Sequence, residues 1–314
     1  MKVDIRTTIA GIRFGNPVIA ASGTFGYGDE IADMVPLKKL GGIITKTITL
    51  KARPGNPPPR LAEVRGGMLN TIGLQNVGVD RFLKEKWCAL RNLPVPVIVS
   101  IAGETADEYV GVARRLQRAG GVQAVELNLS CPNLQKRIVC QDEALVGEII
   151  RGVKKAIRCP VIAKLSPQVA DIAALARHAE RAGADALSLV NTFPGMAVNI
   201  RTWRPMLAVV SGGMSGPAIK PLALKCVWDV CRAVNIPVIG GGGIMDGNDA
   251  VEFLLAGASA LSIGTANFVD PLAPVTIARE IEAYLRARKL RSLSDVIGKM
   301  KISAPLATKS IYER

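Results

Sequence analysis

Residues 237–266 read PVIGGGGIMDGNDAVEFLLAGASALSIGTA, and this pattern guides the interpretation of the whole chain. Two short apolar runs, Pro237–Gly241 and Ala260–Gly264, flank a helical pattern at Asp249–Ala256. Gly257 follows that pattern at the place where glycine commonly ends a helix. Apolar runs of this length are typical of strands buried on both faces, as in parallel sheets. The stretch therefore predicts a strand–helix–strand unit.

The same alternation extends through the chain. Six earlier apolar runs are predicted strands: Val18–Ser22, Gly42–Lys46, Val97–Ile101, Ala124–Leu129, Val161–Leu165 and Ala186–Asn191. Further helices are predicted at Asp107–Gly120, Glu143–Ile157, Val169–Ala182, Ala218–Val234 and Pro271–Leu285. Strands and helices in this order predict an α/β fold, a (β/α)8 TIM barrel, with a doubly wound sheet as the alternative. Residues 1–314 are interpreted as one domain, since such barrels often exceed about 250 residues.

Three segments fall outside these repeats. Val3–Phe14 is predicted to form a short hairpin that closes the barrel bottom. The connections at about 47–79 and 192–217 are long, and long connections in a compact barrel are usually functional loops. Neither contains a low-complexity linker, so no second domain is predicted.

Charge and composition narrow the functional classes. The 40 Lys and Arg residues exceed the 26 Asp and Glu residues, which gives a formal net charge of +14. Basic residues are scattered and aromatic residues make up only 4%, so the composition disfavours nucleic-acid binding and favours an anionic ligand. No apolar run approaches the roughly 18 residues of a membrane span, and the N-terminus lacks the apolar core of a signal peptide. A cytoplasmic protein without a membrane partner is expected.

Histidine and cysteine content argues against metal chemistry. The only histidine, His178, lies in a polar helical pattern and is expected to face solvent; one histidine excludes an HExxH zinc site. The six cysteines contain no CxxC pair and are expected to be reduced thiols, so no metal site is predicted. A disulfide between Cys131 and Cys140 is a minor alternative.

Polar residues and glycines occur at the C-terminal end of every predicted strand. In a (β/α)8 barrel these ends surround the active site, so the residues are predicted to form one pocket. They are Ser22, Lys46, Ser100, Asn128, Cys131, Lys164, Asn191, Thr192, Gly240–Gly243, Gly264 and Thr265. Lys46 and Lys164 lie within buried runs and favour an anionic ligand, unless both side chains reach solvent.

The glycines after the last two strands indicate a phosphate site. Gly242, Gly243 and Gly264 would let backbone N–H groups approach a phosphate, as barrels commonly do after these strands. Gly216 precedes a predicted helix and could add a donor. Tight-turn geometry alone is the alternative.

Three asparagines suit a planar ligand. Asn70, Asn128 and Asn191 each offer a donor and an acceptor, which match a ring with alternating N–H and C=O edges. Taken singly, each is also a common turn residue.

Long motifs resemble one family. VELNLSCPN (125–133), LNTIGLQNVGVDRF (69–82), GGMSGPAIKP (212–221) and the opening stretch at 237–266 resemble the class 1 dihydroorotate dehydrogenases. The resemblance covers nearly the whole chain. It implies a (β/α)8 barrel that binds one FMN at the strand C-termini and oxidises dihydroorotate to orotate in pyrimidine biosynthesis.

The resemblance implies roles for the matching residues. Cys131 is the implied catalytic base, removing the C5 proton while C6 gives a hydride to FMN. The implied substrate-binding residues are Lys46, Asn70, Thr71, Ile72, Gly73, Leu74, Asn128, Asn191 and Thr192. The implied FMN contacts are Ser22, Lys46, Thr47, Ser100, Asn128, Lys164, Val190, Gly216, Gly242, Gly243, Gly264 and Thr265.

NTIGLQN (70–76) and Gly195-Met196 resemble subclass 1B. That resemblance implies a homodimer core joined to an electron-transfer subunit, which carries FAD and a [2Fe–2S] cluster and delivers electrons to NAD+. The alternatives are a class 1A-like homodimer using fumarate, and another FMN barrel acting on dihydropyrimidines or dihydrouridine. A non-redox barrel that binds a sugar phosphate, and a basic nucleic-acid-binding protein, are the alternatives from other classes.

Overall fold

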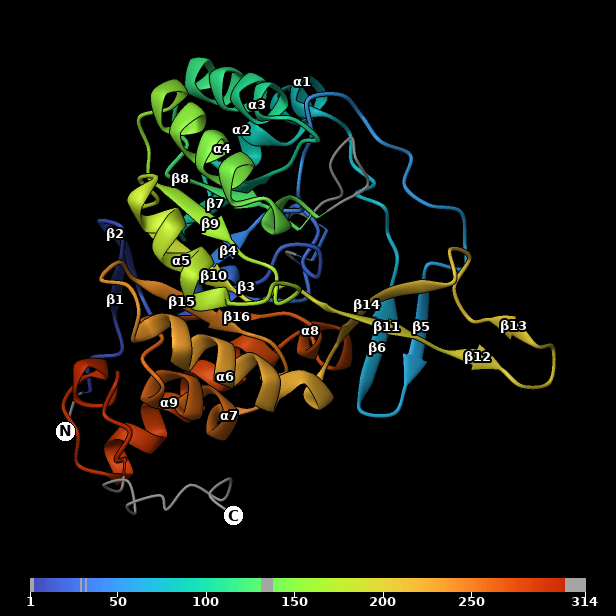
Figure 1. The fold of residues 1–314 in the computed structure, drawn as a ribbon. Coiled ribbons are helices and arrows are strands. Elements are labelled where there is room, and N and C mark those ends of the chain that lie inside the picture. The colour runs from blue at the N-terminus through green and yellow to red at the C-terminus, as the bar shows by residue number, and fades with distance from the viewer. Residues whose placement is uncertain (1–2, 29, 32, 131–137, 303–314) are drawn as a thin grey trace, which may run out of the picture.

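The computed structural model describes residues 3–28, 30–31, 33–130 and 138–302. Its centre is a closed barrel of eight parallel strands, in which each strand pairs with the next barrel strand along the chain (Figure 1). The strands are β3 (Val18–Ala20), β4 (Gly42–Ile44), β7 (Val97–Ile101), β8 (Ala124–Asn128), β9 (Val161–Lys164), β10 (Ala186–Leu189), β15 (Val238–Gly241) and β16 (Ala260–Ile263). Every predicted strand is present, and the predicted (β/α)8 barrel is confirmed.

Helices surround the barrel. They are α1 (Val79–Glu85), α2 (Trp87–Leu90), α3 (Ala106–Ala119), α4 (Glu143–Ala156), α5 (Ile172–Arg181), α6 (Lys220–Cys231), α7 (Gly247–Leu255), α8 (Ala266–Val269) and α9 (Ala273–Ala287), with 3-10 turns η1 (Leu37–Lys39), η2 (Val139–Gln141), η3 (Pro217–Ile219) and η4 (Leu293–Asp295). Several begin at side-chain caps: Thr105, Asp142 and Asp171 accept a hydrogen bond from the backbone N–H three residues on. Within the described ranges, no helix is long and apolar enough to cross a membrane.

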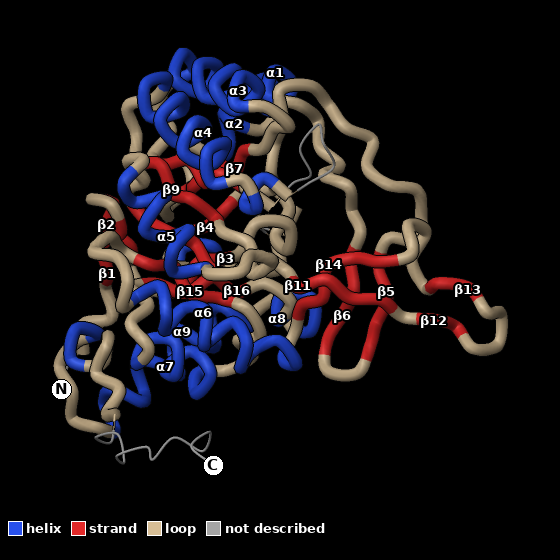
Figure 2. The backbone as a smooth tube through the Cα atoms, viewed as in Figure 1, coloured by secondary structure: helices blue, strands red, loops and turns tan. Residues whose placement is uncertain are grey.

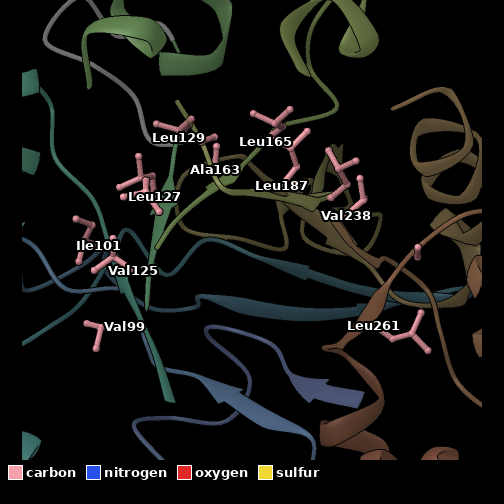
Figure 3. Close-up of a cluster of buried hydrophobic side chains, with 14 of the residues drawn as sticks. Val99, Ile101, Val125, Leu127, Leu129, Ala163, Leu165, Leu187, Val238 and Leu261 are labelled. Carbon is pink, nitrogen blue, oxygen red and sulfur yellow. The ribbon is translucent and has the colours of Figure 1, made fainter. Parts of the chain in front are cut away.

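Side chains alternate across the barrel wall. Val99, Val125 and Leu187 belong to the large cluster between strands and helices, part of which is shown in Figure 3. Ile98 and Ile162, at the intervening positions, point into the barrel and form a second cluster. This two-sided burial explains why the strands appear in the sequence as continuous apolar runs.

The N-terminal hairpin closes the barrel bottom, as predicted. Strands β1 (Thr7–Ile9) and β2 (Ile12–Phe14) pair in antiparallel fashion. Ile9 and Phe14 are both almost fully buried in the same cluster as the inward-facing barrel residues. The hairpin therefore shields the apolar interior at the bottom of the barrel from solvent.

The two long connections form a sheet that the sequence did not reveal. Strands β5 (Leu61–Val64) and β6 (Gly67–Asn70) come from the first connection, and β11 (Phe193–Met196) and β14 (Ser211–Ser215) from the second. They make one antiparallel sheet in the order β11-β14-β6-β5, beside the end of the barrel opposite the hairpin (Figure 2). A small ribbon of β12 (Val198–Asn199) and β13 (Arg204–Pro205) extends beyond it.

Replacing Phe14 with alanine tests the role of the hairpin. The side chain is 1% exposed, so we expect Phe14→Ala to lower the free energy of unfolding by about 3–5 kcal/mol, measured by urea denaturation. Its exposed neighbour Arg13 is the control, and Arg13→Ala should change the same quantity by less than about 0.5 kcal/mol. Equal stability of the two variants would show that the hairpin does not seal the core.

Candidate active site

A cavity of about 530 Å³ lies at the C-terminal ends of the barrel strands, between the barrel and the antiparallel sheet. Its wall includes nearly all of the sequence-predicted site residues: Ser22, Lys46, Thr47, Asn70, Thr71, Ile72, Gly73, Leu74, Asn128, Lys164, Val190, Asn191, Thr192, Gly242, Gly243, Gly264 and Thr265. Segments separated by up to about 240 residues thus meet in one place, because all barrel strands run in the same direction.

Four predicted residues are not seen in the wall. Gly240 is buried within β15 and faces Phe253 and Val227 instead of the cavity. Ser100 is fully buried below it and bonds Thr47. Gly216 is buried where β14 ends, against Gly67, and backs the wall without facing the cavity. Cys131 lies outside the described residues, although Ser130, directly before it, lines the cavity.

The sheet adds wall residues that sequence reasoning missed. Met68 of β6 and Gly212 and Gly213 of β14 line the cavity. The strands β6 and β14 pair at this point, and Asn70 Nδ2 donates to the Gly213 carbonyl at 3.2 Å. A side chain at Gly213 would overlap Thr192, since its Cβ would lie 2.0 Å from Thr192 Oγ1. From the sequence, Gly212 and Gly213 could have been assigned to the cavity wall only because they belong to the family motif at 212–221.

Two lysines give the cavity positive charge. Lys46 and Lys164 are half-buried, and neither forms an ion pair with a described carboxylate. Lys164 stands level with Asn128 on the adjacent strand. Unpaired ammonium groups at the mouth of a barrel favour an anionic ligand in that space.

Amides and hydroxyls in the wall form a connected network. Asn191 Nδ2 donates to Asn128 Oδ1 at 3.2 Å, and Asn191 Oδ1 accepts from the Thr192 backbone N–H at 2.8 Å. Asn128 Nδ2 donates to Thr47 Oγ1 at 3.4 Å. These contacts hold both asparagine side chains in set orientations beside the cavity.

The glycine segment after β15 and β16 presents unused donors. The backbone N–H groups of Gly242, Gly243, Gly264 and Thr265 form no hydrogen bond with any part of the chain that the structure describes. Gly242 and Gly243 have φ angles of 119° and 80°, which glycine adopts readily. Four such donors around one side of a cavity form a site for an anion such as phosphate.

The loop that carries these donors is held from behind. Asp249 Oδ2 accepts from the Met245 backbone N–H at 2.9 Å, and Lys220 Nζ donates to Asp249 Oδ1 at 2.6 Å and to Glu252 Oε1 at 2.9 Å. Hydrogen bonds to these carboxylates raise the pKa of Lys220, so it remains a cation. A Cβ at Gly243 would lie 2.7 Å from Lys220 N, which leaves no room for a side chain.

The remaining thiols and the histidine lie elsewhere. Burial raises the pKa of Cys140 to about 12, of Cys231 to about 12 and of Cys159 to about 11, so these groups stay protonated near neutral pH. Cys140 is a free thiol that accepts from Ser166 N at 3.3 Å. The expectation that His178 faces solvent was wrong: it is half-buried against Gly147 of α4, and its Nε2 is buried without a described partner.

Comparison with known proteins agrees with this architecture. Residues 4–285 match the family model described as dihydroorotate dehydrogenase. The chain is 54% identical over 295 residues to the dihydroorotate dehydrogenase B (NAD(+)) catalytic subunit of Endomicrobium trichonymphae. The aligned region covers 94% of this chain and 96% of that protein. Proteins of the same name from Citrifermentans bemidjiense and Geobacter sulfurreducens are each 50% identical to this chain. Their aligned regions cover 95% and 96% of this chain, respectively, and 99% of each relative. The chain belongs to the dihydroorotate dehydrogenase family.

Proposed function

We propose that this protein oxidises dihydroorotate to orotate with a bound FMN, and that the electrons pass to NAD+ through a partner subunit. The observation that carries the proposal is the cavity wall, which joins a phosphate-type cradle, two unpaired lysines and an oriented pair of amides. The relatives named above, each described as the catalytic subunit of an NAD(+) enzyme, support the choice of acceptor.

The wall residues fit FMN. The four open N–H groups from Gly242 to Thr265 would hold its phosphate, and a cavity of about 530 Å³ is within the range of small-molecule sites. Lys164 would place positive charge beside the flavin, with Ser22, Thr47 and Val190 along its edge. When bound, FMN supplies the hydride acceptor for the reaction. Ser100 and Gly216 would then contribute from behind the wall.

The substrate would occupy the sheet side of the same cavity. Dihydroorotate carries a carboxylate and a ring with alternating N–H and C=O groups, which match Lys46 and the amides of Asn128 and Asn191. Asn70, Thr192 and the segment from Thr71 to Leu74 would close the remaining sides. Their contribution is positioning: they hold the ring so that C6 faces the hydride acceptor.

Cys131 is the proposed base that removes the C5 proton. A thiol suits this step because its ordinary pKa, about 8.5, can be tuned toward neutral. The other described thiols with raised pKa values are poor candidates, and Ser130 brings the chain to the cavity wall directly before residue 131.

Substitutions at Cys131 test this assignment. In the wild type, dihydroorotate should bleach the flavin absorbance under anaerobic conditions. Cys131→Ala should retain FMN yet lose steady-state oxidation, whereas Cys131→Ser should keep weak activity with its pH optimum moved upward, because serine is the weaker acid. Cys88→Ala, at an exposed thiol, is the control and should behave as the wild type. Wild-type turnover in Cys131→Ala would remove this residue from the role.

A glycine substitution tests the phosphate cradle. Gly243→Ala adds a Cβ 2.7 Å from Lys220 N at a φ of 80°, so we expect FMN to bind about tenfold or more weakly, measured by fluorescence quenching. Gly11→Ala is matched for backbone strain, with a φ of 82°, but its Cβ meets nothing within 4 Å and it lies in the hairpin. Equal FMN affinity in both variants would place the phosphate elsewhere.

The proposed assembly is a homodimer core with an electron-transfer subunit that carries FAD and a [2Fe–2S] cluster, in the cytoplasm. We expect the chain alone to reduce artificial dyes but not NAD+, and the chain co-expressed with such a flavoprotein to form a heterotetramer that reduces NAD+. NAD+ reduction by the isolated chain, or turnover with fumarate instead, would contradict the assembly while leaving dihydroorotate oxidation in place.

A further inference from the structure

Glu126 is a buried carboxylate that the proposed reaction does not use. It lies on β8 and points into the barrel two residues before Asn128; it is 0% exposed and does not line the cavity. Its Oε1 accepts from Ser100 Oγ at 3.3 Å, whereas its Oε2 is buried without a partner among the described residues. Burying a carboxyl group with one oxygen unbonded lowers the stability of the fold, and an apolar side chain at this position would avoid that cost. Because the chain carries this cost, we expect the Glu126 carboxyl group to have a function.

A chain of hydroxyls connects Glu126 to the cavity wall. Ser100 Oγ lies 2.9 Å from Thr47 Oγ1, and Thr47 Oγ1 lies 3.2 Å from Ser22 Oγ. Distance alone leaves the donor in each pair undetermined. Each hydroxyl has one proton, however, so the direction of one bond determines the direction of the next.

The carboxylate settles that direction. Ser100 Oγ donates to Glu126 Oε1, so its only proton is used and it must accept from Thr47. Thr47 has then used its only proton. Its oxygen can only accept from other groups, which agrees with the donation by Asn128 Nδ2 at 3.4 Å.

The same direction continues into the amides. With Nδ2 turned toward Thr47, the Oδ1 of Asn128 faces Asn191 and accepts from its Nδ2 at 3.2 Å and from the Ser130 backbone N–H at 3.3 Å. Asn191 in turn has its Oδ1 on the Thr192 N–H. Backbone N–H groups of Ser130 and Thr192 thus hold the two amide oxygens, and the Thr47 oxygen is the described acceptor on the Nδ2 side of Asn128.

We infer that Glu126 is a positioning residue: through Ser100 it keeps Thr47 Oγ1 as the acceptor of Asn128 Nδ2, and so holds the Asn128 amide in place toward the pyrimidine. The inference rests on the proposed function, because it assumes that this amide meets the substrate ring. In Glu126→Gln, the side-chain NH2 can donate to Ser100 and the direction of the hydroxyl hydrogen bonds can reverse. Thr47 would then point its proton at Asn128 Nδ2, and that hydrogen bond would be lost.

The test measures orotate binding to the FMN-loaded protein by the change in flavin absorbance. Glu126→Gln and Ser100→Ala should each weaken orotate binding by about tenfold or more, and the double variant should be no weaker than either single one, since both break the same chain. Ile162→Val is the matched control. Ile162 pairs with Glu126 in register and is 1% exposed, but its apolar side chain takes no part in the hydrogen bonds from Glu126 to Thr47. The variant should therefore bind orotate as tightly as the wild type.

A second measurement uses the FMN-free protein. The infrared difference spectrum between wild type and Glu126→Gln should contain the stretching band of an ionised carboxylate; the band of a protonated carboxyl would overturn the assigned direction. Wild-type orotate affinity in Glu126→Gln, or fully additive losses in the double variant, would also overturn the inference. If Glu126→Gln fails to fold, wild-type orotate affinity in Ser100→Ala overturns it. Failure of wild-type protein to bind orotate would instead refute the proposed function.

Discussion

Because every strand of the barrel runs in the same direction, every strand ends at the same rim. Lys46, Asn128, Lys164 and Gly242 come from distant parts of the chain, yet each lies at or just past the C-terminal end of a strand. Closure then brings the first strand against the last, so that β3 and β16 place Ser22 and Gly264 on one wall. Without the closed, parallel pairing of the strands, these residues would lie far apart and could not form one cavity.

The barrel interior changes character along its axis. The lower layer is apolar and is sealed by Ile9 and Phe14 from the hairpin. The layer above carries polar side chains, among them Ser100, Glu126 and Ser188, all buried. Polar groups in that position weaken the core unless they are bonded, and the hydrogen bonds of Ser100 and Glu126 lead upward into the cavity wall rather than outward to solvent. The fold thus gives up some apolar burial to support an oriented site.

The antiparallel sheet completes the cavity from outside the barrel. It brings Asn70 and Gly213, from two connections far apart in the chain, into one hydrogen-bonded pair opposite the strand ends. Its strands contain Gly67, Gly212 and Gly213, residues with low strand propensity. A side chain at Gly67 or Gly212 would meet the backbone of the neighbouring strand, and one at Gly213 would meet the Thr192 side chain. Local sequence preference therefore opposes the structure that tertiary contacts impose.

The eight strands, the principal helices and the cavity residues at the strand ends could be predicted from the amino-acid sequence, since two-sided burial and strand–helix alternation leave a periodic record along the chain. Other cavity residues, such as Thr71 to Leu74, were expected only because of the family resemblance. Three features emerged only in the folded chain: the long connections pair as a sheet, His178 is half-buried, and Ser100 belongs beneath the wall. The direction of the hydrogen-bond chain from Glu126 also required coordinates. These features depend on contacts between segments far apart in the chain, and such contacts leave no local periodicity from which they could be inferred.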